Sequence, residues 1–249
     1  MTLCDDFRDL HAEGTFILPN PWDRGSALAL ENMGFRALAT TSAGLGRSIG
    51  KDDQQVTRDE LVEHVTRLVS VLHVPLSVDS ERLHPDDAGG IAETVRMLAR
   101  AGASGCSIED YDPDSGSIVP VQEATEAVET AAAACAEHGL VLTARAENHL
   151  YGAGDLDDTV ERLVRYAEAG AEVVYAPGLW ARSDIGRVVA ETGRPVNVLA
   201  MPEGPAVPEL AALGVRRVST GARLHGAAHR CLLEGARELL DTGTSEYGR

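Results

Sequence analysis

The amino acid that this sequence most lacks is lysine. Of its 249 residues 22 are basic, and all of these are arginine except Lys51. Chemistry that needs a Schiff-base lysine or a phosphate-loop lysine would therefore have to use that one residue. Acidic residues number 39, so the formal net charge is −17. This charge argues against nucleic acids and anionic membranes as partners, because both reward clusters of positive charge.

The sequence also lacks paired cysteines and long apolar runs. Its cysteines show no zinc-ligand spacing, so we expect reduced, structural thiols at Cys4, Cys106, Cys135 and Cys231. No apolar run reaches the roughly 20 residues of a membrane span, and the acidic N-terminus has no apolar signal sequence. Hydrophobic residues make up 44% and charged residues 24%, which is ordinary for a globular protein. We expect a cytoplasmic protein.

What the sequence does contain is a regular alternation of short apolar segments with longer helical ones. Many of the longer segments end at a glycine, as at Gly102 and Gly139, where a left-handed residue can close a helix. The eight predicted strands are Thr15–Pro19, Ala37–Thr41, Leu76–Asp79, Gly105–Glu109, Val141–Arg145, Val173–Ala176, Val196–Leu199 and Arg217–Thr220. The predicted helices are Arg24–Met33, Arg58–Val71, Gly90–Ala101, Val121–His138, Leu156–Ala169, Ala181–Glu191, Pro205–Leu213 and Leu224–Leu240.

This alternation predicts βαβ units and a parallel sheet. Eight units in 249 residues, with no linker rich in Pro, Gly or Ser between them, predict one α/β domain over residues 1–249. A (β/α)8 TIM barrel fits the pattern better than a doubly wound sheet, which is the alternative. In such a barrel the reactive side chains lie at the carboxyl ends of the strands.

Acidic side chains gather at two neighbouring strand ends. Asp79 and Glu81 follow the third strand, and if the strand persists its period of two points both the same way. The fourth strand ends in Glu109 and Asp110, which adds acid to the same rim. Converging carboxylates repel unless a cation lies among them, and a hard divalent ion such as Mg²⁺ prefers oxygen ligands. The alternative is that these acids cap helices or solvate loops, but their occurrence on two neighbouring strands favours a metal site.

Two further segments are candidates for substrate contacts. Arg145, at the end of the fifth strand, is either an ion-pair partner for Glu109 or Glu147 or a fork for a substrate carboxylate. The small residues of Thr41–Gly46, after the second strand, offer backbone N–H groups that could cradle an anion. No helix is expected directly behind them.

Several ordered motifs fall at the matching strand ends of a known family. They are Asn20-Pro21-Trp22-Asp23, Thr41-Ser42-Ala43-Gly44, Gly50-Lys51-Asp52-Asp53, Asp79-Ser80-Glu81, Ile108-Glu109-Asp110, Ala144-Arg145 and Pro195-Val196-Asn197-Val198-Leu199. On these motifs the sequence resembles the isocitrate lyase/phosphoenolpyruvate mutase superfamily, nearly from end to end. The resemblance implies a Mg²⁺-dependent barrel that binds a small 2-oxo acid and passes through an enolate-type intermediate. It also implies a homo-oligomer, a dimer or a tetramer, with an exchanged C-terminal helix.

The resemblance also assigns roles to single residues. Asp79 resembles the direct metal ligand, and Glu81 and Glu109 match the acids that complete the metal shell, largely through water. Asp53 aligns with the catalytic loop aspartate that closes over the substrate, and Arg145 with the arginine that contacts substrate oxygen. The remaining substrate-binding positions are Ser42, Ala43 and Gly44 in a carboxylate-binding turn, and Asn197 at the seventh strand end.

The sequence departs from the better-known lyases of this superfamily in one loop. Those enzymes carry a Lys-Lys-Cys-Gly-His motif after the fourth strand, whereas the matching stretch here, 111–120, has neither lysine nor cysteine. Cys106 is no substitute, because strand alternation points it away from the side that displays Glu109. The loss disfavours isocitrate and methylisocitrate and favours a smaller substrate. Residues that either replace the lost proton carrier or are simply solvated are His84, Tyr111, His149 and Tyr151.

We therefore expect a Mg²⁺-dependent lyase that cleaves a C–C bond of a small 2-oxo or 2-hydroxy (di)carboxylate. Hydrolysis of an oxaloacetate-type substrate is the nearest alternative. Phosphonopyruvate hydrolysis and phosphoenolpyruvate mutase-like C–P chemistry come next, because this sequence offers few cationic groups for a phosphoryl group. A catalytically silent barrel that serves as a binding or assembly module is an alternative of another class, against which the intact set of acids speaks.

Overall fold

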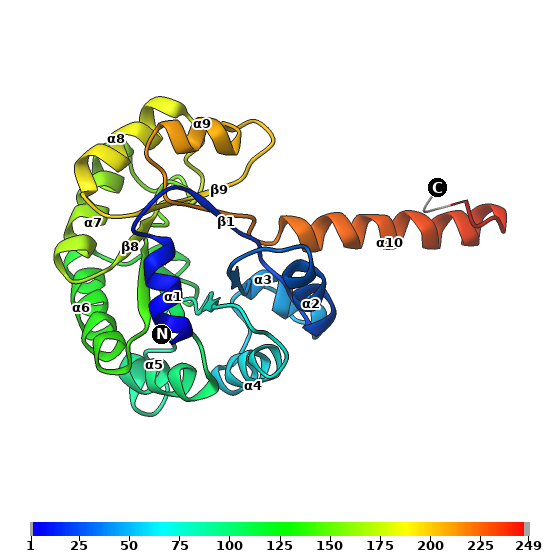
Figure 1. Cartoon of the computed structure of the whole chain (residues 1–249), viewed down its shortest axis with the longest axis horizontal. Coiled ribbons are helices and arrows are strands. Elements are labelled where there is room, and N and C mark those ends of the chain that lie inside the picture. The colour runs from blue at the N-terminus through cyan, green and yellow to red at the C-terminus, as the bar shows by residue number, and fades with distance from the viewer. Residues whose placement is uncertain (1, 247–249) are drawn as a thin grey trace.

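Eight parallel strands form a ring in the computed structural model, which describes residues 2–246 (Figure 1). The strands are β1 (Phe16–Leu18), β2 (Leu38–Ala39), β3 (Leu76–Val78), β4 (Gly105–Glu109), β7 (Val141–Arg145), β8 (Val173–Tyr175), β9 (Val196–Leu199) and β10 (Arg217–Ser219). They are hydrogen-bonded in the order β1-β10-β9-β8-β7-β4-β3-β2. The strands at the two ends of this order, β1 and β2, come together where the Ala39 N–H donates to the Pro19 carbonyl at 3.1 Å, which closes the ring. The predicted (β/α)8 barrel is therefore confirmed.

Helices follow the strands, and all of them except the last, α10, cover the outside of the ring. Asp23 and Thr57 begin two of them, because each side chain accepts a hydrogen bond from the N–H three residues on. Gly102 and Gly139 close two others with φ of 93° and 74°, the left-handed conformation that favours glycine. The helices after the strands are α2 (Arg24–Asn32), α4 (Arg58–Val69), α5 (Gly90–Ala101), α6 (Val121–His138), α7 (Leu156–Glu168), α8 (Arg182–Thr192), α9 (Val207–Ala212) and α10 (Arg223–Thr242).

Three elements differ from what the sequence patterns predict. They are α1 (Leu3–Leu10), α3 (Ser42–Ser48) and the hairpin of β5 (Tyr111–Asp112) and β6 (Ser117–Ile118). The expectation that no helix opens behind the second strand is wrong, because Thr41 caps α3 by accepting from the Gly44 N–H at 3.3 Å. A Cβ on Gly44 would lie 2.5 Å from Thr41 Cγ2 and 3.2 Å from Trp22 Cβ. Glycine therefore lets α3 pack closely at the rim of the barrel.

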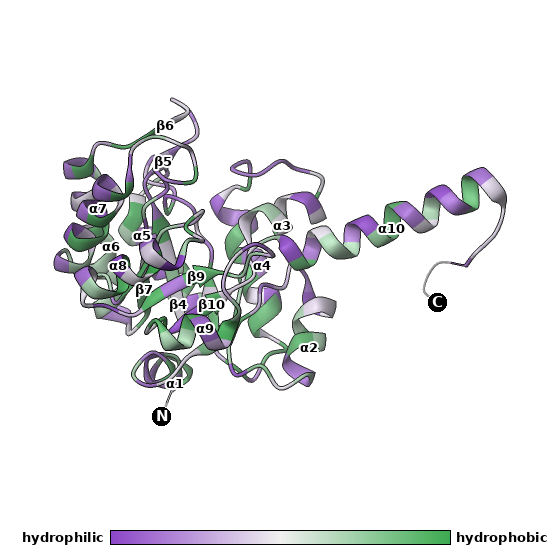
Figure 2. Ribbon diagram, turned by 90° about the horizontal axis from the view of Figure 1, so that it is seen from above, coloured by the Kyte–Doolittle hydropathy of each residue, from purple (hydrophilic) through white to green (hydrophobic). Residues whose placement is uncertain are grey.

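Helix α1 closes one end of the barrel. Its buried side chains Phe7 and Leu10 join an apolar cluster with Phe16, Leu18, Ala37, Ala39, Val141 and Val173. Gly105 leaves room for this plug, because a Cβ there would lie 2.6 Å from the Val141 carbonyl oxygen and 2.9 Å from Phe7 Cε1. Figure 2 shows the β5–β6 hairpin at the opposite end from α1. The loops that follow the strands therefore gather at the end that α1 does not close.

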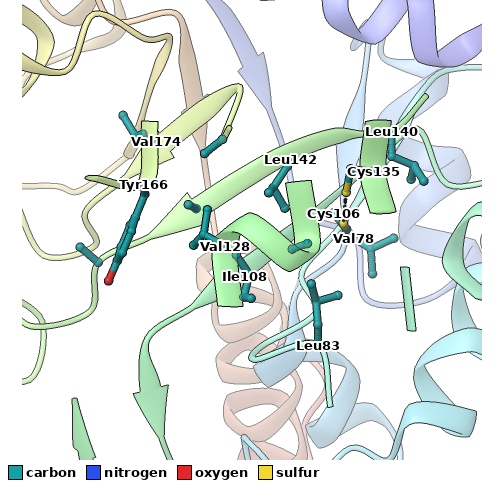
Figure 3. Close-up of a cluster of buried hydrophobic side chains, with 14 of the residues drawn as sticks. Val78, Leu83, Cys106, Ile108, Val128, Cys135, Leu140, Leu142, Tyr166 and Val174 are labelled. Atoms are coloured by element: carbon teal, nitrogen blue, oxygen red, sulfur yellow. Dashed lines mark hydrogen bonds between the residues drawn. The ribbon is translucent and has the colours of Figure 1, made fainter. Parts of the chain in front are cut away.

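A larger apolar core lies between the strands and the outer helices (Figure 3). Cys106 of β4 points into it, and its Sγ lies 3.5 Å from the Sγ of Cys135 on α6. Both thiols are buried and free, so Cys106 turns away from the barrel interior as strand alternation predicts. Among residues 2–246, no helix is long and apolar enough to cross a membrane.

Helix α10 projects from the barrel instead of packing along it (Figure 1). It has 20 residues, and of these only His225 and Gly235 are buried. Leu232 is 63% exposed and Leu240 is 85% exposed. Figure 2 shows that apolar and polar residues alternate along this helix. The C-terminal helix therefore presents apolar side chains that the described part of its own chain does not cover.

Substitution of Gly105 by alanine tests the plug. Gly105→Ala should lower the free energy of unfolding by about 1–3 kcal/mol, because the added methyl group meets a backbone carbonyl and the Phe7 ring. Gly186→Ala is the matched control, since this glycine lies inside α8 and the nearest atom to its Cβ is Leu213 Cδ2 at 3.9 Å. It should raise stability by about 0.5–1 kcal/mol. Urea unfolding measures the free energy of unfolding of both variants. Equal changes in the two would contradict the close packing of α1 against Gly105.

Candidate active site

A cavity of about 230 Å³ lies inside the barrel, toward the carboxyl ends of the strands. Two smaller cavities share residues with its wall, one lined by Glu109 and Arg145 and the other by Asp79 and Glu81. Gly44 is buried behind the wall, within α3. The predicted site residues that line the main cavity are Ser42, Ala43, Asp53, Asp79, Arg145 and Asn197.

Arg145, the last residue of β7, holds three carboxylates at once. Its Nη1 lies 2.7 Å from Asp79 Oδ1. Its Nη2 lies 3.1 Å from Glu109 Oε2, and its Nε lies 2.7 Å from Glu147 Oε1. Of the alternatives that the sequence leaves open, the structure shows ion pairs with both Glu109 and Glu147, and it adds Asp79. Burial alone would lower the pKa of Arg145, but the three acids raise it well above its usual value.

Asp79 is also bound by the start of α3. Its Oδ2 accepts from the Ser42 N–H at 2.9 Å and from Ser42 Oγ at 3.1 Å. A carboxylate at a helix N-terminus is stabilised by the free N–H groups there. The anion cradle predicted within Thr41–Gly46 therefore already holds an anion of the protein itself, the Asp79 side chain. The Gly44 N–H is not available to a ligand either, because Thr41 accepts from it.

Glu81 does not continue β3, so the expectation that strand alternation aligns it with Asp79 is wrong. It has φ of 49° in a turn that is closed by the Leu83 N–H and the Ser80 carbonyl at 2.8 Å. The residue is 8% exposed, and its Oε1 has no hydrogen-bond partner within the described residues 2–246. Burial, then Asp79 and Asp53, raise the pKa of Glu81 to about 8. A turn, and not the strand, thus brings this acid near Asp79.

The loop between α3 and α4 brings two more polar groups to the site. Desolvation by the surrounding protein, and then the charge of Asp79, raise the pKa of Asp53. The neighbouring Gln54, with φ of 65°, donates from its Nε2 to Glu109 Oε1 at 2.7 Å. Sequence reasoning missed Gln54, and its position beside Asp53 was the one available signal. The loop therefore reaches from Asp79 on one strand end to Glu109 on the next.

The acids of the site outnumber its cation. Burial first, and then Glu147 and Asp79, raise the pKa of Glu109 well above its usual range in spite of Arg145. Among residues 2–246 no three His, Cys, Asp or Glu side chains converge closely enough to hold a metal as they stand. The surplus negative charge and the unpartnered oxygen of Glu81 nevertheless fit a divalent cation. The acids of the site are Asp53, Asp79, Glu81, Glu109 and Glu147.

Two charged residues that the sequence singles out point away from Arg145. Asp110 turns outward, where its Oδ2 accepts from Arg162 Nη1 at 3.0 Å and from Tyr166 Oη at 2.6 Å. The Nζ of Lys51 lies 2.6 Å from Glu60 Oε2 at the start of α4. The one lysine of the chain is thus paired with an acid and does not line the main cavity.

Asn197 lies deeper than the sequence predicts. It is the second of four residues in β9, opposite Tyr175 and Arg217, and not at the strand end. Its Oδ1 accepts from Arg217 Nε at 2.9 Å, and its Nδ2 donates to Ser219 Oγ at 3.0 Å. Tyr175, which sequence reasoning missed, lines the cavity with its ring centre 5.5 Å from the Arg145 guanidinium. Its place at the end of a predicted strand was the signal that could have identified it.

Comparison with known proteins identifies the family to which this barrel belongs. The family model described as phosphoenolpyruvate phosphomutase matches residues 7–240 of the chain. A crystal structure of a candidate lyase/mutase from Burkholderia cenocepacia J2315 is 43% identical and superposes with a TM-score of 0.92. The match covers 98% of this chain and 90% of that one.

Two further relatives are similar over nearly the whole chain. An uncharacterised protein of Mycobacterium tuberculosis is 35% identical over 231 residues, which cover 90% of this chain and 86% of that protein. An oxaloacetate decarboxylase of Chromohalobacter salexigens is 29% identical over 257 residues, which cover 98% of this chain and 88% of that enzyme. The resemblance found in the sequence is thereby confirmed, and the chain belongs to the phosphoenolpyruvate phosphomutase family.

Proposed function

We propose that this enzyme is a Mg²⁺-dependent lyase that cleaves a C–C bond of a small 2-oxo or 2-hydroxy (di)carboxylate through an enolate-type intermediate. The observation that carries the proposal is the cluster of buried acids around Arg145, inside a barrel of this family. The relative named oxaloacetate decarboxylase supports it, because that name describes cleavage of a C–C bond in a small oxo dicarboxylate.

Asp79, Glu81 and Glu109 are the residues that would hold Mg²⁺, in part through water. When bound there, the ion supplies a positive centre that polarises a carbonyl oxygen and stabilises the negative charge that develops on it. The unpartnered Oε1 of Glu81 supports this assignment. So does the pKa of Glu81, raised to about 8, since a carboxylate with that pKa is poorly compensated in the absence of a cation.

Arg145 would serve as the second cationic partner of the substrate. Its guanidinium is held by three acids and lies near the ring of Tyr175. Little reorganisation is therefore needed when negative charge develops on a nearby substrate oxygen. Asp53, in the loop between α3 and α4, would close over the bound substrate. The substrate-binding wall would consist of Ser42, Ala43 and Asn197, with Gly44 acting through the position of α3.

The loop after β4 has neither the lysine nor the cysteine of the better-known lyases, and this loss favours a smaller substrate. It forms the β5–β6 hairpin, and the ring of Tyr111 stacks on that of Tyr151 with centroids 3.9 Å apart and an interplanar angle of 3°. The stack joins the hairpin to the loop after β7. Partial burial of a side chain that is still 47% exposed, then Glu109 and Glu147, raise the pKa of Tyr151 to about 12. The hydroxyl of Tyr151 thus stays protonated and is a candidate proton donor.

The two alternative reactions, hydrolysis and C–P chemistry, differ in the side chains that they require. Hydrolysis of an oxaloacetate-type substrate would use the same acids and Arg145, and is the nearest alternative. C–P chemistry needs donors for a phosphoryl group. Two of the few cations near the site's loops are already engaged, Lys51 by Glu60 and Arg82 by Asp112. The structure therefore offers less support for C–P chemistry than for C–C cleavage.

We also propose that the protein is a homo-oligomer, a dimer or a tetramer, in which α10 packs on a second copy of the chain. Fully burying a leucine contributes about 1.5–3 kcal/mol. Large apolar side chains exposed along one helix are typical of an interaction site. A second copy is the partner that the family resemblance implies. The exposed leucines of α10 are Leu224, Leu232, Leu233, Leu239 and Leu240.

Calorimetric titration of Mg²⁺ tests the proposed metal ligands. The wild-type protein should bind the ion, and Asp79→Asn should weaken binding at least about tenfold, because a neutral amide is a poorer ligand for a hard cation. Asp59→Asn, which changes an exposed acid in the first turn of α4, is the matched control and should bind as wild type does. If wild type and Asp79→Asn bind alike, or neither binds, the assignment is wrong.

Turnover of a substrate panel tests the activity. C4 to C6 oxo and hydroxy acids, with phosphonopyruvate included, are assayed for release of pyruvate, glyoxylate or oxalate with Mg²⁺ and with EDTA. At least one C–C substrate should react only with Mg²⁺, and Arg145→Lys should lower kcat/KM on the order of 100-fold. Arg165→Lys, on the exposed side of α7, should have no effect. Turnover of phosphonopyruvate alone supports C–P chemistry, and an inert panel supports a silent barrel.

Light scattering after size-exclusion chromatography tests the oligomer. Wild type should elute as a dimer or tetramer at about 10 µM, and Leu232→Asp should shift it toward monomer, because a charge cannot be buried at the helix interface without a partner. Glu234→Gln, on the same helix, is the control and should leave the assembly intact. A wild-type monomer at this concentration would refute the packing of α10 on a second copy.

A further inference from the structure

The barrel interior holds a second arginine, Arg217, at the first residue of β10. It is 4% exposed. Its Nε donates to Asn197 Oδ1 at 2.9 Å, its Nη2 donates to Thr143 Oγ1 at 3.0 Å, and its Nη1 lies 3.4 Å from His11 Nε2. Burial and the charge of Arg217 lower the pKa of His11 to about 3, so this ring stays neutral. No carboxylate of residues 2–246 forms an ion pair with Arg217.

An unpaired buried cation lowers the stability of a fold. Another buried arginine of the chain avoids this, because Arg162 pairs with Asp110 at 3.0 Å and with Asp158 at 3.2 Å. Burial lowers the pKa of Arg217 to about 9, and the side chain is still charged near neutral pH. A buried charge that lowers the stability of the fold is a candidate for a functional role.

Arg217 and Arg145 line the same cavity. Arg217 Nη2 reaches Thr143, which lies two residues before Arg145 on β7. At about 3.3 Å per residue, the two arginines are therefore anchored at levels about 6.6 Å apart along the strand. A dicarboxylate of about four or five carbons spans such a distance between its outer carboxylate oxygens. Beside apolar side chains such as Leu18 and Val78, the lining of the cavity carries polar groups, those of Ser77, Ser107, Thr143, Asn197 and Ser219.

We propose that Arg217 binds a carboxylate in the deep part of this cavity, and that this carboxylate belongs to a substrate whose reacting end lies at Arg145. The proposal rests on the proposed function, since it takes the Arg145 cluster as the reacting centre. Three of the five N–H donors of Arg217 are engaged by neutral partners, which leaves two for a carboxylate. Asn197 and Thr143 then position the arginine. The substrate class is a short dicarboxylate that lies along the barrel axis.

Calorimetric titration in buffer with Mg²⁺ tests the deep site, with succinate and glutarate compared with propionate and butyrate. Wild type should bind the dicarboxylates at least about tenfold more tightly. Arg217→Met should lose this preference and bind the monocarboxylates as before. Its melting temperature should equal or exceed that of wild type, because the substitution removes an unpaired buried charge. Arg217→Lys should retain part of the preference, since it keeps the charge but not the planar fork.

Arg162→Met is the matched control. It removes a paired arginine and leaves Asp110 uncompensated, so its melting temperature should fall while the dicarboxylate preference persists in the folded protein. A wild type without the preference, or an Arg217→Met that keeps it, overturns the proposal. If chloride binds to wild type and not to Arg217→Met while carboxylates are not discriminated, the site takes a halide and the proposal is wrong. Titration of Mg²⁺ into Asp79→Asn reports on the metal site separately, so either proposal can fail alone.

Discussion

The ion pairs of Arg145 are the interaction on which the rest of the site depends. Three carboxylates cannot be buried at neighbouring strand ends without a cation among them, because each uncompensated buried charge costs several kcal/mol. Strand register supplies the geometry. Glu109 lies opposite Arg145 in the β4–β7 pair, and Asp79 follows β3 on the other side of β4. Asp79 and Arg145 are 66 positions apart in sequence, and the barrel brings them into contact. There the acids orient the guanidinium, and its positive charge compensates the negative charges of the acids.

The two ends of the barrel serve different needs. The end closed by α1 is packed with apolar side chains, as barrel interiors usually are. The layers above it carry Ser77, Ser107, Thr143 and Asn197, which bury little apolar surface. Stability must therefore come mainly from the plug and from the large apolar core between the strands and the outer helices. This division leaves the interior next to Arg145 free to be polar, and a ligand with charged ends requires a polar interior.

The sequence predicted those features of the fold that depend on residues close together in the chain. Alternation of strands and helices, with glycines at the helix ends, was enough to predict the barrel. The acids at the ends of β3 and β4 were enough to predict which strand ends carry the candidate site, and the structure brings Asp79 and Glu109 together at Arg145. The position of Glu81 was not predictable in this way, because it depends on a left-handed residue within a turn. Gln54 and Asn197 depend on partners 55 and 20 residues away, Glu109 and Arg217. No local pattern encodes such contacts, since tertiary packing decides them.

The groups proposed for proton transfer narrow the proposed chemistry further than the acids alone. Cleavage of a 2-hydroxy acid needs a base for the hydroxyl proton and an acid for the enolate, whereas loss of CO₂ from a 2-oxo diacid needs the acid alone. Asp79 and Glu109 are tied to Arg145, so Asp53 is the chief candidate for a base. Tyr151 holds a proton near the cluster. With the lysine and cysteine loop of the larger lyases replaced by a hairpin, decarboxylation of a 2-oxo diacid is the C–C cleavage that requires least of the residues present.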